Sequence, residues 1–217
     1  MNLQQFADGL PAKQSQESLA PGAVILRGFA SSRSALLLQL IHEVSERAPF
    51  RFMTTPSGHR MSVAMTNCGV AGWVTDRKGY RYSARDPMTG QRWPALPAAL
   101  LALACEAAAR AGFSAFAPDA CLINRYEPGA RLALHQDRNE HDLEAPIVSA
   151  SLGRPAVFLF GGYRRTDRPQ QVLLAHGDVA VWGGAARLRF HGVQPLKVGE
   201  HPLLGPCRMN LTLRKVR

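Results

Sequence analysis

From residue 120 onward, the chain breaks into short aliphatic runs separated by Gly, Pro and Asp, and this pattern limits the folds open to it. The runs cover 120–126, 130–135, 146–152, 155–160, 171–175, 178–182, 190–195 and 208–215. Strands this short and this closely spaced predict an antiparallel sandwich or jelly roll rather than alternating strand–helix units. The fold class expected is therefore mostly β, with α-helices flanking the sheets.

Two helices are expected before this region. An apolar stripe at helical spacing predicts a helix ending near Arg47, with Ser31 or Ser32 as its cap. A second helix is expected over 97–111, with a proline in its first turn and Gly112 as its stop. Both helices would pack outside the sheet.

The chain carries no signal that predicts export or membrane insertion. Its first residues lack the basic segment and apolar run of a signal peptide, and the longest uncharged apolar stretch, 93–105, is short and contains two prolines. Its four cysteines form no CxxC pair, which fits a reducing compartment. We expect a cytoplasmic monomer with no obligate protein partner, in which a flexible leader over 1–20 precedes one domain over 21–217, its first strand within 22–29.

Positive charge is concentrated between the two predicted helices. The chain has 26 Lys and Arg against 16 Asp and Glu, and residues 50–93 hold seven of the basic residues but only two of the acidic ones. Aromatic residues, Trp73 and Tyr80 among them, are interleaved with these charges. Such a segment suits phosphates and stacked bases, although a solvated β-meander fits the same pattern. The charge makes nucleic acid the default partner.

Two His-x-Asp motifs occur, and they predict different things. The motif at 176–178 has a central glycine and leads straight into a strand, which predicts a turn in which Asp178 bonds backbone groups. The motif at 135–137 ends a predicted strand, where alternation puts His135 and Asp137 on one face. With His191 as a third ligand, these residues match the two-histidine, one-carboxylate site of non-haem Fe(II) oxygenases.

The last predicted strand is polar on one face. Strict alternation over 208–214 puts four polar side chains together: Arg208, Asn210, Thr212 and Arg214. The face is either the solvent side of an edge strand or an inner wall whose arginines bind a dicarboxylate. Asn124 and Tyr126 share a face as well and could add neutral hydrogen bonds. A zinc ion on the three metal ligands would leave the two arginines unexplained.

Taken in order, these segments resemble the bacterial AlkB family of Fe(II)- and 2-oxoglutarate-dependent nucleic-acid dealkylases. The resemblance runs over roughly 20–215 and rests on the motifs at 124–137, 181–184, 191–192 and 208–214, with 61–69 and 73–80 upstream. It implies a double-stranded β-helix in which His135, Asp137 and His191 hold the catalytic iron and O2 is a cosubstrate. It also implies that 2-oxoglutarate is bound by Asn124, Tyr126, Arg208, Asn210 and Arg214.

The resemblance implies a nucleotide-recognition lid over 50–93. Trp73 would stack on the damaged base and Tyr80 would reach the backbone. The substrate-binding residues expected beside them are Thr55, Met61, Ser62, Asn139 and Arg165. Two positions depart from the family's archetype, which has an acidic residue where this chain has Asn139 and an aromatic one where it has Arg189. Since an amide donates as well as accepts, discrimination among bases could be altered.

The function implied is oxidative demethylation of 1-methyladenine and 3-methylcytosine in DNA and/or RNA, a direct-reversal repair that releases formaldehyde, succinate and CO2. Three alternatives stay open: an oxygenase of a protein or small molecule, RNA (tRNA) base modification, and a nucleic-acid-binding module with a structural metal or none. The dense basic and aromatic segment argues against a protein or small-molecule substrate. The full set of metal and cosubstrate residues argues against a mere binding module.

Overall fold

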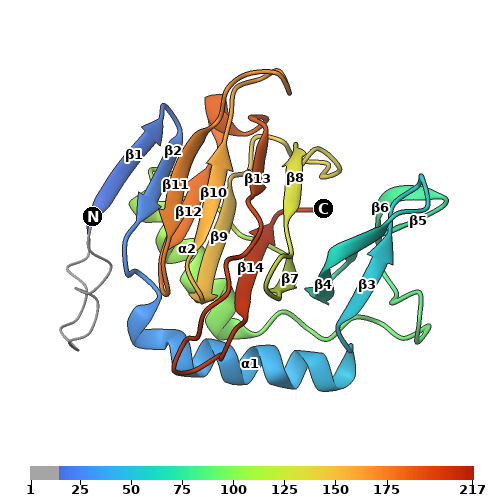
Figure 1. The fold of residues 1–217 in the computed structure, drawn as a ribbon. Coiled ribbons are helices and arrows are strands. Elements are labelled where there is room, and N and C mark those ends of the chain that lie inside the picture. The colour runs from blue at the N-terminus through green and yellow to red at the C-terminus, as the bar shows by residue number, and fades with distance from the viewer. Residues whose placement is uncertain (1–14) are drawn as a thin grey trace.

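The computed structural model describes residues 15–217, which form two α-helices and three antiparallel β-sheets (Figure 1). The major sheet has the order β1-β2-β12-β9-β14-β7-β4-β3 and the minor sheet the order β11-β10-β13-β8. The strands of the major sheet are β1 (Gln16–Ala20), β2 (Ala23–Leu26), β3 (Arg51–Thr54), β4 (Arg60–Gly69), β7 (Ala120–Tyr126), β9 (Ile147–Gly153), β12 (Val179–Trp182) and β14 (Arg208–Arg214). Those of the minor sheet are β8 (Leu132–His135), β10 (Ala156–Phe160), β11 (Gln170–Leu174) and β13 (His191–Val193).

The major and minor sheets enclose one hydrophobic core. Phe158 and Phe160 alternate with outward residues along β10 of the minor sheet and meet side chains of the major sheet, such as Trp182, whose ring lies 5.9 Å from that of Phe158. This two-layer arrangement of antiparallel strands confirms the predicted double-stranded β-helix with flanking helices.

The outer face of the major sheet is covered by α1 (Ser34–Arg47) and α2 (Ala98–Arg110), which lie below and behind the strands in Figure 1. Their buried stripes join a second core that includes Leu211 and Leu213 of β14. Because side chains alternate along a strand, the side chains on the opposite, inner face of the sheet are those of Arg208, Asn210, Thr212 and Arg214, which we call the polar row of β14. Helix packing on one side therefore turns the polar row of β14 inward.

Every strand predicted from residue 120 onward is present, with ends that shift by at most two residues. Two expectations need correction. Residues 16–20, predicted to belong to a flexible leader, form β1, whose largely exposed side chains leave no hydrophobic pattern to read. Ser31 and Ser32 do not cap α1, because a 3₁₀ turn over Ser31–Arg33 precedes it without a side-chain cap. The remainder of the predicted leader, residues 1–14, lies outside the described residues.

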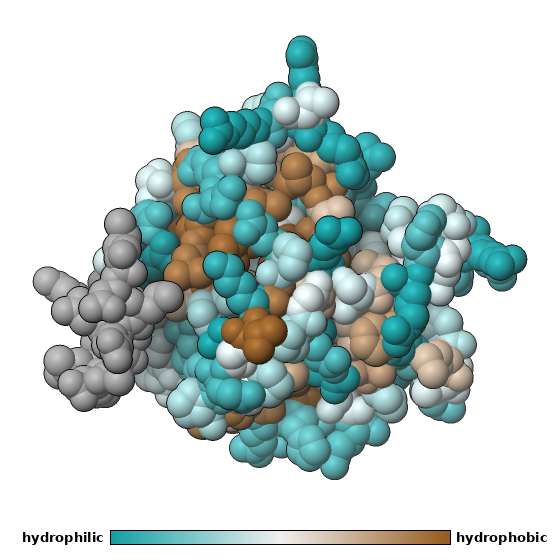
Figure 2. Space-filling view, in the orientation of Figure 1, coloured by the Kyte–Doolittle hydropathy of each residue, from teal (hydrophilic) through white to brown (hydrophobic). Residues whose placement is uncertain are grey.

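The third sheet is a hairpin of β5 (Gly72–Asp76) and β6 (Gly79–Ser83) that contacts β3 and β4 at one end of the major sheet (Figure 1). Figure 2 shows mainly hydrophilic residues on this part of the surface, whereas apolar residues gather over the β10–β11 side. None of the helices in residues 15–217 is long and apolar enough to cross a membrane.

Candidate metal centre and cosubstrate site

Two neighbouring strands of the minor sheet bring three metal-binding side chains together. His135 ends β8 and is the direct antiparallel partner of His191 on β13, while Asp137 follows β8 by two residues. The potential ligand atoms of these residues all lie within 4.8 Å of one another. Asp137 and His191 are buried, whereas the side chain of His135 is 36% exposed and marks the open side of the cluster.

The histidine rings are oriented for metal binding by backbone carbonyls. Nδ1 of His135 lies 2.8 Å from the carbonyl oxygen of Ala133, and Nδ1 of His191 lies 3.1 Å from that of Arg189. A carbonyl can only accept, so each Nδ1 carries the proton and each Nε2 keeps a free lone pair toward Asp137. Burial and the neighbouring His191 lower the pKa of His135 to about 4, which favours the neutral form that a metal requires.

The polar row of β14 lines the inner wall of the major sheet beside this cluster. β14 lies between β9 and β7, so it is not an edge strand, and its four polar side chains are all buried. Asn210 and Arg208 are in register with Asn124 and Tyr126 of β7. Nδ2 of Asn124 donates to Oδ1 of Asn210 over 3.3 Å, and the guanidinium of Arg208 lies 4.9 Å from the ring of Tyr126.

Arg208 is a buried cation that lacks a counterion among the residues described. Its Nη2 donates to the Ser151 hydroxyl over 2.9 Å, but its Nε and Nη1 are buried with no hydrogen-bond partner in the described chain. Leaving such donors unpaired is costly, and a carboxylate bound against this guanidinium would supply the acceptor that the described residues lack. The orphaned donors therefore fit a dicarboxylate cosubstrate next to the metal ligands.

Arg214, at the other end of the polar row, is already paired. Its Nη2 lies 2.6 Å from Oδ2 of Asp137, and its Nη1 donates to the Tyr82 hydroxyl over 3.2 Å. Burial alone would raise the pKa of Asp137, but the charge of Arg214 holds it well below its usual range. Arg214 therefore keeps this carboxylate ionised and ready to bind a cation.

Three residues that the sequence patterns did not single out complete this network. Glu140 accepts from the Tyr82 hydroxyl over 2.6 Å and pairs with Arg187 over 3.1 Å. Arg187 also donates to the backbone carbonyl of Asp137 over 2.5 Å. The one sequence signal for Glu140 is its position three residues after Asp137, and its burial and partners follow only from the folded structure. Through Tyr82, the network connects the β5–β6 hairpin to the metal-binding carboxylate.

The β5–β6 hairpin presents an aromatic surface at the site. The rings of Trp73 and Tyr80 are stacked with centroids 5.7 Å apart, and Tyr80 is about half exposed. Nε1 of Trp73 lies 3.4 Å from Oδ1 of Asn139, two residues after Asp137. The amide of Asn67 bonds both backbone groups of Trp73 and so holds this residue in place.

The other predicted substrate residues make their own contacts outside the group of metal ligands. Thr55 is in the β3–β4 turn, where its hydroxyl bonds the backbone of His59, and Met61 packs against the inter-sheet core. Ser62 exchanges hydrogen bonds with the backbone of Arg131. Arg165 is exposed, with its guanidinium 5.5 Å from the ring of Phe190, the neighbour of a metal ligand. None of these contacts brings Thr55 or Met61 into the metal cluster itself.

Two further expectations concern residues outside the cluster. Arg189 donates to the Gly161 carbonyl over 2.6 Å and lies over the ring of Phe160, so it stabilises the end of β10. Asp178 accepts from the backbone amides of Gly28 and Ala175, which confirms the turn predicted for the second His-x-Asp motif.

This fold and donor set define a non-haem Fe(II)- and 2-oxoglutarate-dependent dioxygenase. The sequence profile of the 2OG-Fe(II) oxygenase superfamily matches residues 22–214. Alpha-ketoglutarate-dependent dioxygenase AlkB of Salmonella typhimurium is 58% identical over 213 residues, covering 98% of this chain and 97% of that protein. AlkB of Escherichia coli strain K12 is 57% identical over the same shares of the two chains. The chain belongs to the AlkB family of this superfamily.

A solved structure supports the same assignment at the level of the fold. The structure of OsALKBH1 superposes with a TM-score of 0.82 and 28% sequence identity, covering 93% of this chain and all of that one. Fe(II) and 2-oxoglutarate are thus the cofactor and cosubstrate of this enzyme, and His135, Asp137 and His191 form its metal-binding triad.

Proposed function

We propose that this enzyme oxidatively demethylates N-alkylated bases, above all 1-methyladenine and 3-methylcytosine in DNA and/or RNA, and that it acts as a cytoplasmic monomer. The observation that carries the proposal is the aromatic surface of Trp73 and Tyr80 next to Asn139 and the metal triad. Aromatic rings stack on any base, and a cation-rich segment around them suits the phosphates. Two relatives that match over part of this chain are described as nucleic acid dioxygenases.

When bound, Fe(II), 2-oxoglutarate and O2 supply the oxidation that releases the N-methyl carbon as formaldehyde, with succinate and CO2 as coproducts. His135, Asp137 and His191 would hold the iron through two neutral imidazoles and one carboxylate. Arg208 would bind the distal carboxylate of 2-oxoglutarate, for which its two unpaired donors are free. Asn124, Tyr126 and Asn210 would line the same anion.

Arg214 has a positioning part in this scheme, beside the end of the cosubstrate that reaches the metal. Its bond to Asp137 leaves that carboxylate in one orientation, and its bond to Tyr82 ties the metal ligand to the β5–β6 hairpin. The hairpin and the segment around it, residues 50–93, would act as the nucleotide-recognition lid. A base that binds against the hairpin would therefore affect the Asp137 carboxylate through Tyr82 and Arg214.

The chain would take its target base out of the stack. A methyl group on the pairing edge of a base cannot be reached inside a duplex, so the base must flip or come from a single strand. Trp73 would stack on the flipped base, Asn139 would face its exocyclic group, and Tyr80 would contact the backbone. Thr55, Met61, Ser62 and Arg165 would line the path of the strand.

Mass spectrometry of methylated oligonucleotides tests this proposal. The protein is incubated with Fe(II), ascorbate and O2, with and without 2-oxoglutarate, on 1-methyladenine and 3-methylcytosine in DNA and RNA. We expect a loss of about 14 Da, one methyl replaced by hydrogen, only when 2-oxoglutarate is present. Asp137→Ala should abolish this loss while oligonucleotide binding survives. Succinate formation without any demethylation would contradict the nucleic-acid substrate and favour a protein or small molecule instead.

A further inference from the structure

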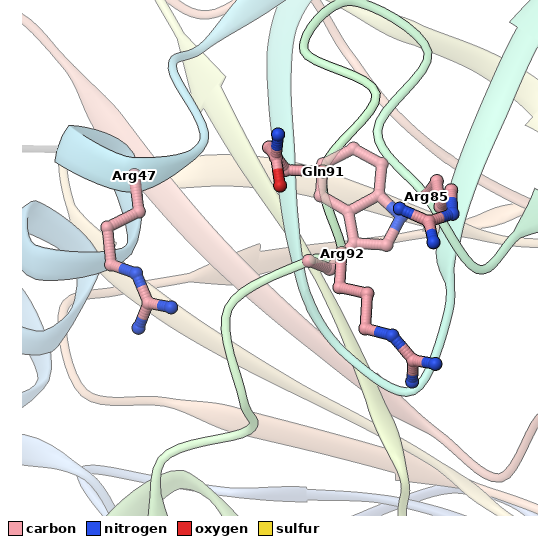
Figure 3. Close-up of a pocket in the computed structure, with 5 residues that line it drawn as sticks. Arg47, Arg85, Gln91 and Arg92 are labelled. Atoms are coloured by element: carbon pink, nitrogen blue, oxygen red, sulfur yellow. The ribbon is translucent and has the colours of Figure 1, made fainter.

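A hollow of about 580 Å³ lies outside the site described above, between the end of α1 and the segment that joins β6 to α2. Its lining residues, shown in Figure 3, are Arg47, Arg85, Gln91, Arg92 and Trp93. Arg47 is the last residue of α1, and the others belong to the joining segment. We call this site the arginine hollow.

The three arginines of the hollow are uncompensated cations. No acidic side chain within residues 15–217 pairs with Arg47, Arg85 or Arg92, and all three are exposed. The two acidic residues of the basic segment are engaged elsewhere: Asp86 binds Arg51, and Asp76 binds Arg81 over 2.7 Å. The hollow therefore carries three positive charges that no acidic side chain of the described residues balances.

The backbone brings two of these charges face to face. Arg85 and Arg92 form an antiparallel β-bridge, so their side chains are direct cross-strand neighbours. Like charges in this position repel each other, and an anion between or beside them relieves the repulsion. Arg85 is held by a bond from its Nη1 to the Gly90 carbonyl over 2.9 Å. In Figure 3, Arg47 lies across the hollow from this pair.

The floor of the hollow is a buried, hydrogen-bonded tryptophan that adjoins the β5–β6 hairpin. Trp93 is 4% exposed, and its Nε1 donates to the Ser83 carbonyl over 2.8 Å. Its ring lies so close to Gly72 that a Cβ added there would be 2.4 Å away. Gly72 and Ser83 pair at the open end of the hairpin, and Gly72 precedes Trp73. The hollow is therefore built on the base of the element that carries the aromatic surface.

We propose that the arginine hollow binds a backbone phosphate of the nucleic acid, outside the nucleotide whose base enters the active site. Guanidinium groups match phosphate oxygens with paired N–H donors, and such contacts set the register of a bound strand. The link from Trp93 to the hairpin would hold that phosphate at a constant offset from Trp73. The inference rests on the proposed function for the identity of the polyanion.

Salt-dependent binding to unmethylated single-stranded DNA tests the hollow without any turnover. Each arginine is changed to glutamine singly and all three together, and Arg110→Gln, an exposed arginine at the end of α2, is the matched control for one lost charge. In the triple variant we expect Kd to rise at least about tenfold and the log–log salt slope to fall by about 0.7, the contribution of one phosphate contact on a single strand. Arg110→Gln should leave the slope unchanged.

Substrate length separates this inference from the proposed function. With a methylated mononucleotide, which has no phosphate outside the nucleotide that enters the active site, the triple variant should keep the KM of the unaltered enzyme, whereas KM for a methylated oligonucleotide of about 13 nucleotides should rise. If no methylated oligonucleotide is turned over, the proposed function fails, yet the binding result still decides about the hollow. An unchanged slope, or an equal change in Arg110→Gln, would overturn the inference. So would inorganic phosphate that binds the hollow while DNA affinity stays the same in the variant, since the site would then serve a small anion.

Discussion

Arg214 and Asp137 form a buried ion pair in which Nη2 of the arginine lies 2.6 Å from Oδ2 of the carboxylate. The pair links the end of the polar row on β14 to a metal ligand that follows β8, and so connects the two sheets at the active site. Since both partners are almost fully buried, neither can be solvated by water if the other is lost.

Arg214→Gln should therefore destabilise the metal-free protein strongly. Removing one partner of a buried pair leaves an uncompensated charge, which costs about 3–5 kcal/mol in the free energy of unfolding. Urea unfolding followed by circular dichroism measures this change. Arg125→Gln is the control, because its pair with Glu127 lies at the surface and contributes at most about 1 kcal/mol. Equal losses in the two variants would contradict the structural importance of the buried pair.

Arg208→Met should separate cosubstrate binding from folding. The substitution removes a buried cation that has no counterion among the described residues, so the free energy of unfolding should stay level or increase. Loss of two charge-assisted hydrogen bonds should weaken 2-oxoglutarate binding by about 100-fold or more. Calorimetry with Mn(II) in place of Fe(II) gives Kd without turnover.

The control for Arg208→Met is Arg154→Met, whose guanidinium bonds the Glu200 and Val198 carbonyls away from the metal. It should leave the 2-oxoglutarate Kd unchanged. A Kd within about threefold of the original in Arg208→Met would exclude this arginine as the carboxylate partner.

Periodicity explains which parts of the site the sequence could predict. Alternation along β14 and at the end of β8 determines which side chains share a face, so the pairing of His135 with Asp137 and the polar face of β14 were predictable from residue order. Whether that face points to solvent or inward was not. The family motifs then related His191 to the other two ligands. These features depend on the alternation of side chains along a strand, which follows directly from the order of residues.

Contacts that depend on the packing of distant elements were not predictable. Arg187 and Glu140 are 47 residues apart and meet only when the loop after β8 folds against the turn after β12. Arg214 was expected beside the cosubstrate, and its direct bond to Asp137 emerges only from the assembled sheets. The strand β1 was missed because its side chains are largely exposed and its order comes from backbone pairing to β2.

A stacked histidine pair far from the metal ligands predicts a pH dependence of stability. The rings of His176 and His201 lie 4.6 Å apart, and their Nδ1 atoms accept backbone N–H bonds from Gly153 and Leu203. A second proton on either ring must go to Nδ1 and break that bond. Burial lowers the pKa of both residues below 6.5. The charge of a protonated His201 lowers the pKa of His176 further, and the charge of Arg154 does the same for His201.

A histidine whose pKa is lower in the folded state binds fewer protons when folded, so its stabilising contribution is complete above about pH 6.5 and is lost as the pH falls below that value. We expect Tm to fall over this interval and His201→Gln to flatten the fall. His42→Gln, an exposed residue on α1, is the control and should leave the profile as it is. Parallel profiles for the original protein and His201→Gln would contradict the role of the pair.

Asn139 should decide between bases that carry an exocyclic amine and those that carry a carbonyl at the same edge. Its Oδ1 faces Nε1 of Trp73 at 3.4 Å, so its amide can both accept from a base and donate to it. Asn139→Asp leaves only acceptors. We expect the ratio of kcat/KM for 1-methyladenine over 1-methylguanine to rise by about tenfold or more, because a carboxylate repels the guanine carbonyl.

Paired oligonucleotides that differ only in the methylated base measure this ratio under matched conditions. Asn139→Ala is the control, because it removes donor and acceptor together and should lower both rates without raising the ratio. A ratio that stays constant in Asn139→Asp would mean that this side chain does not face the base edge, and that the stack against Trp73 alone positions the substrate. A ratio that rises in the aspartate variant and not in the alanine variant assigns the discrimination to the hydrogen-bonding polarity of residue 139.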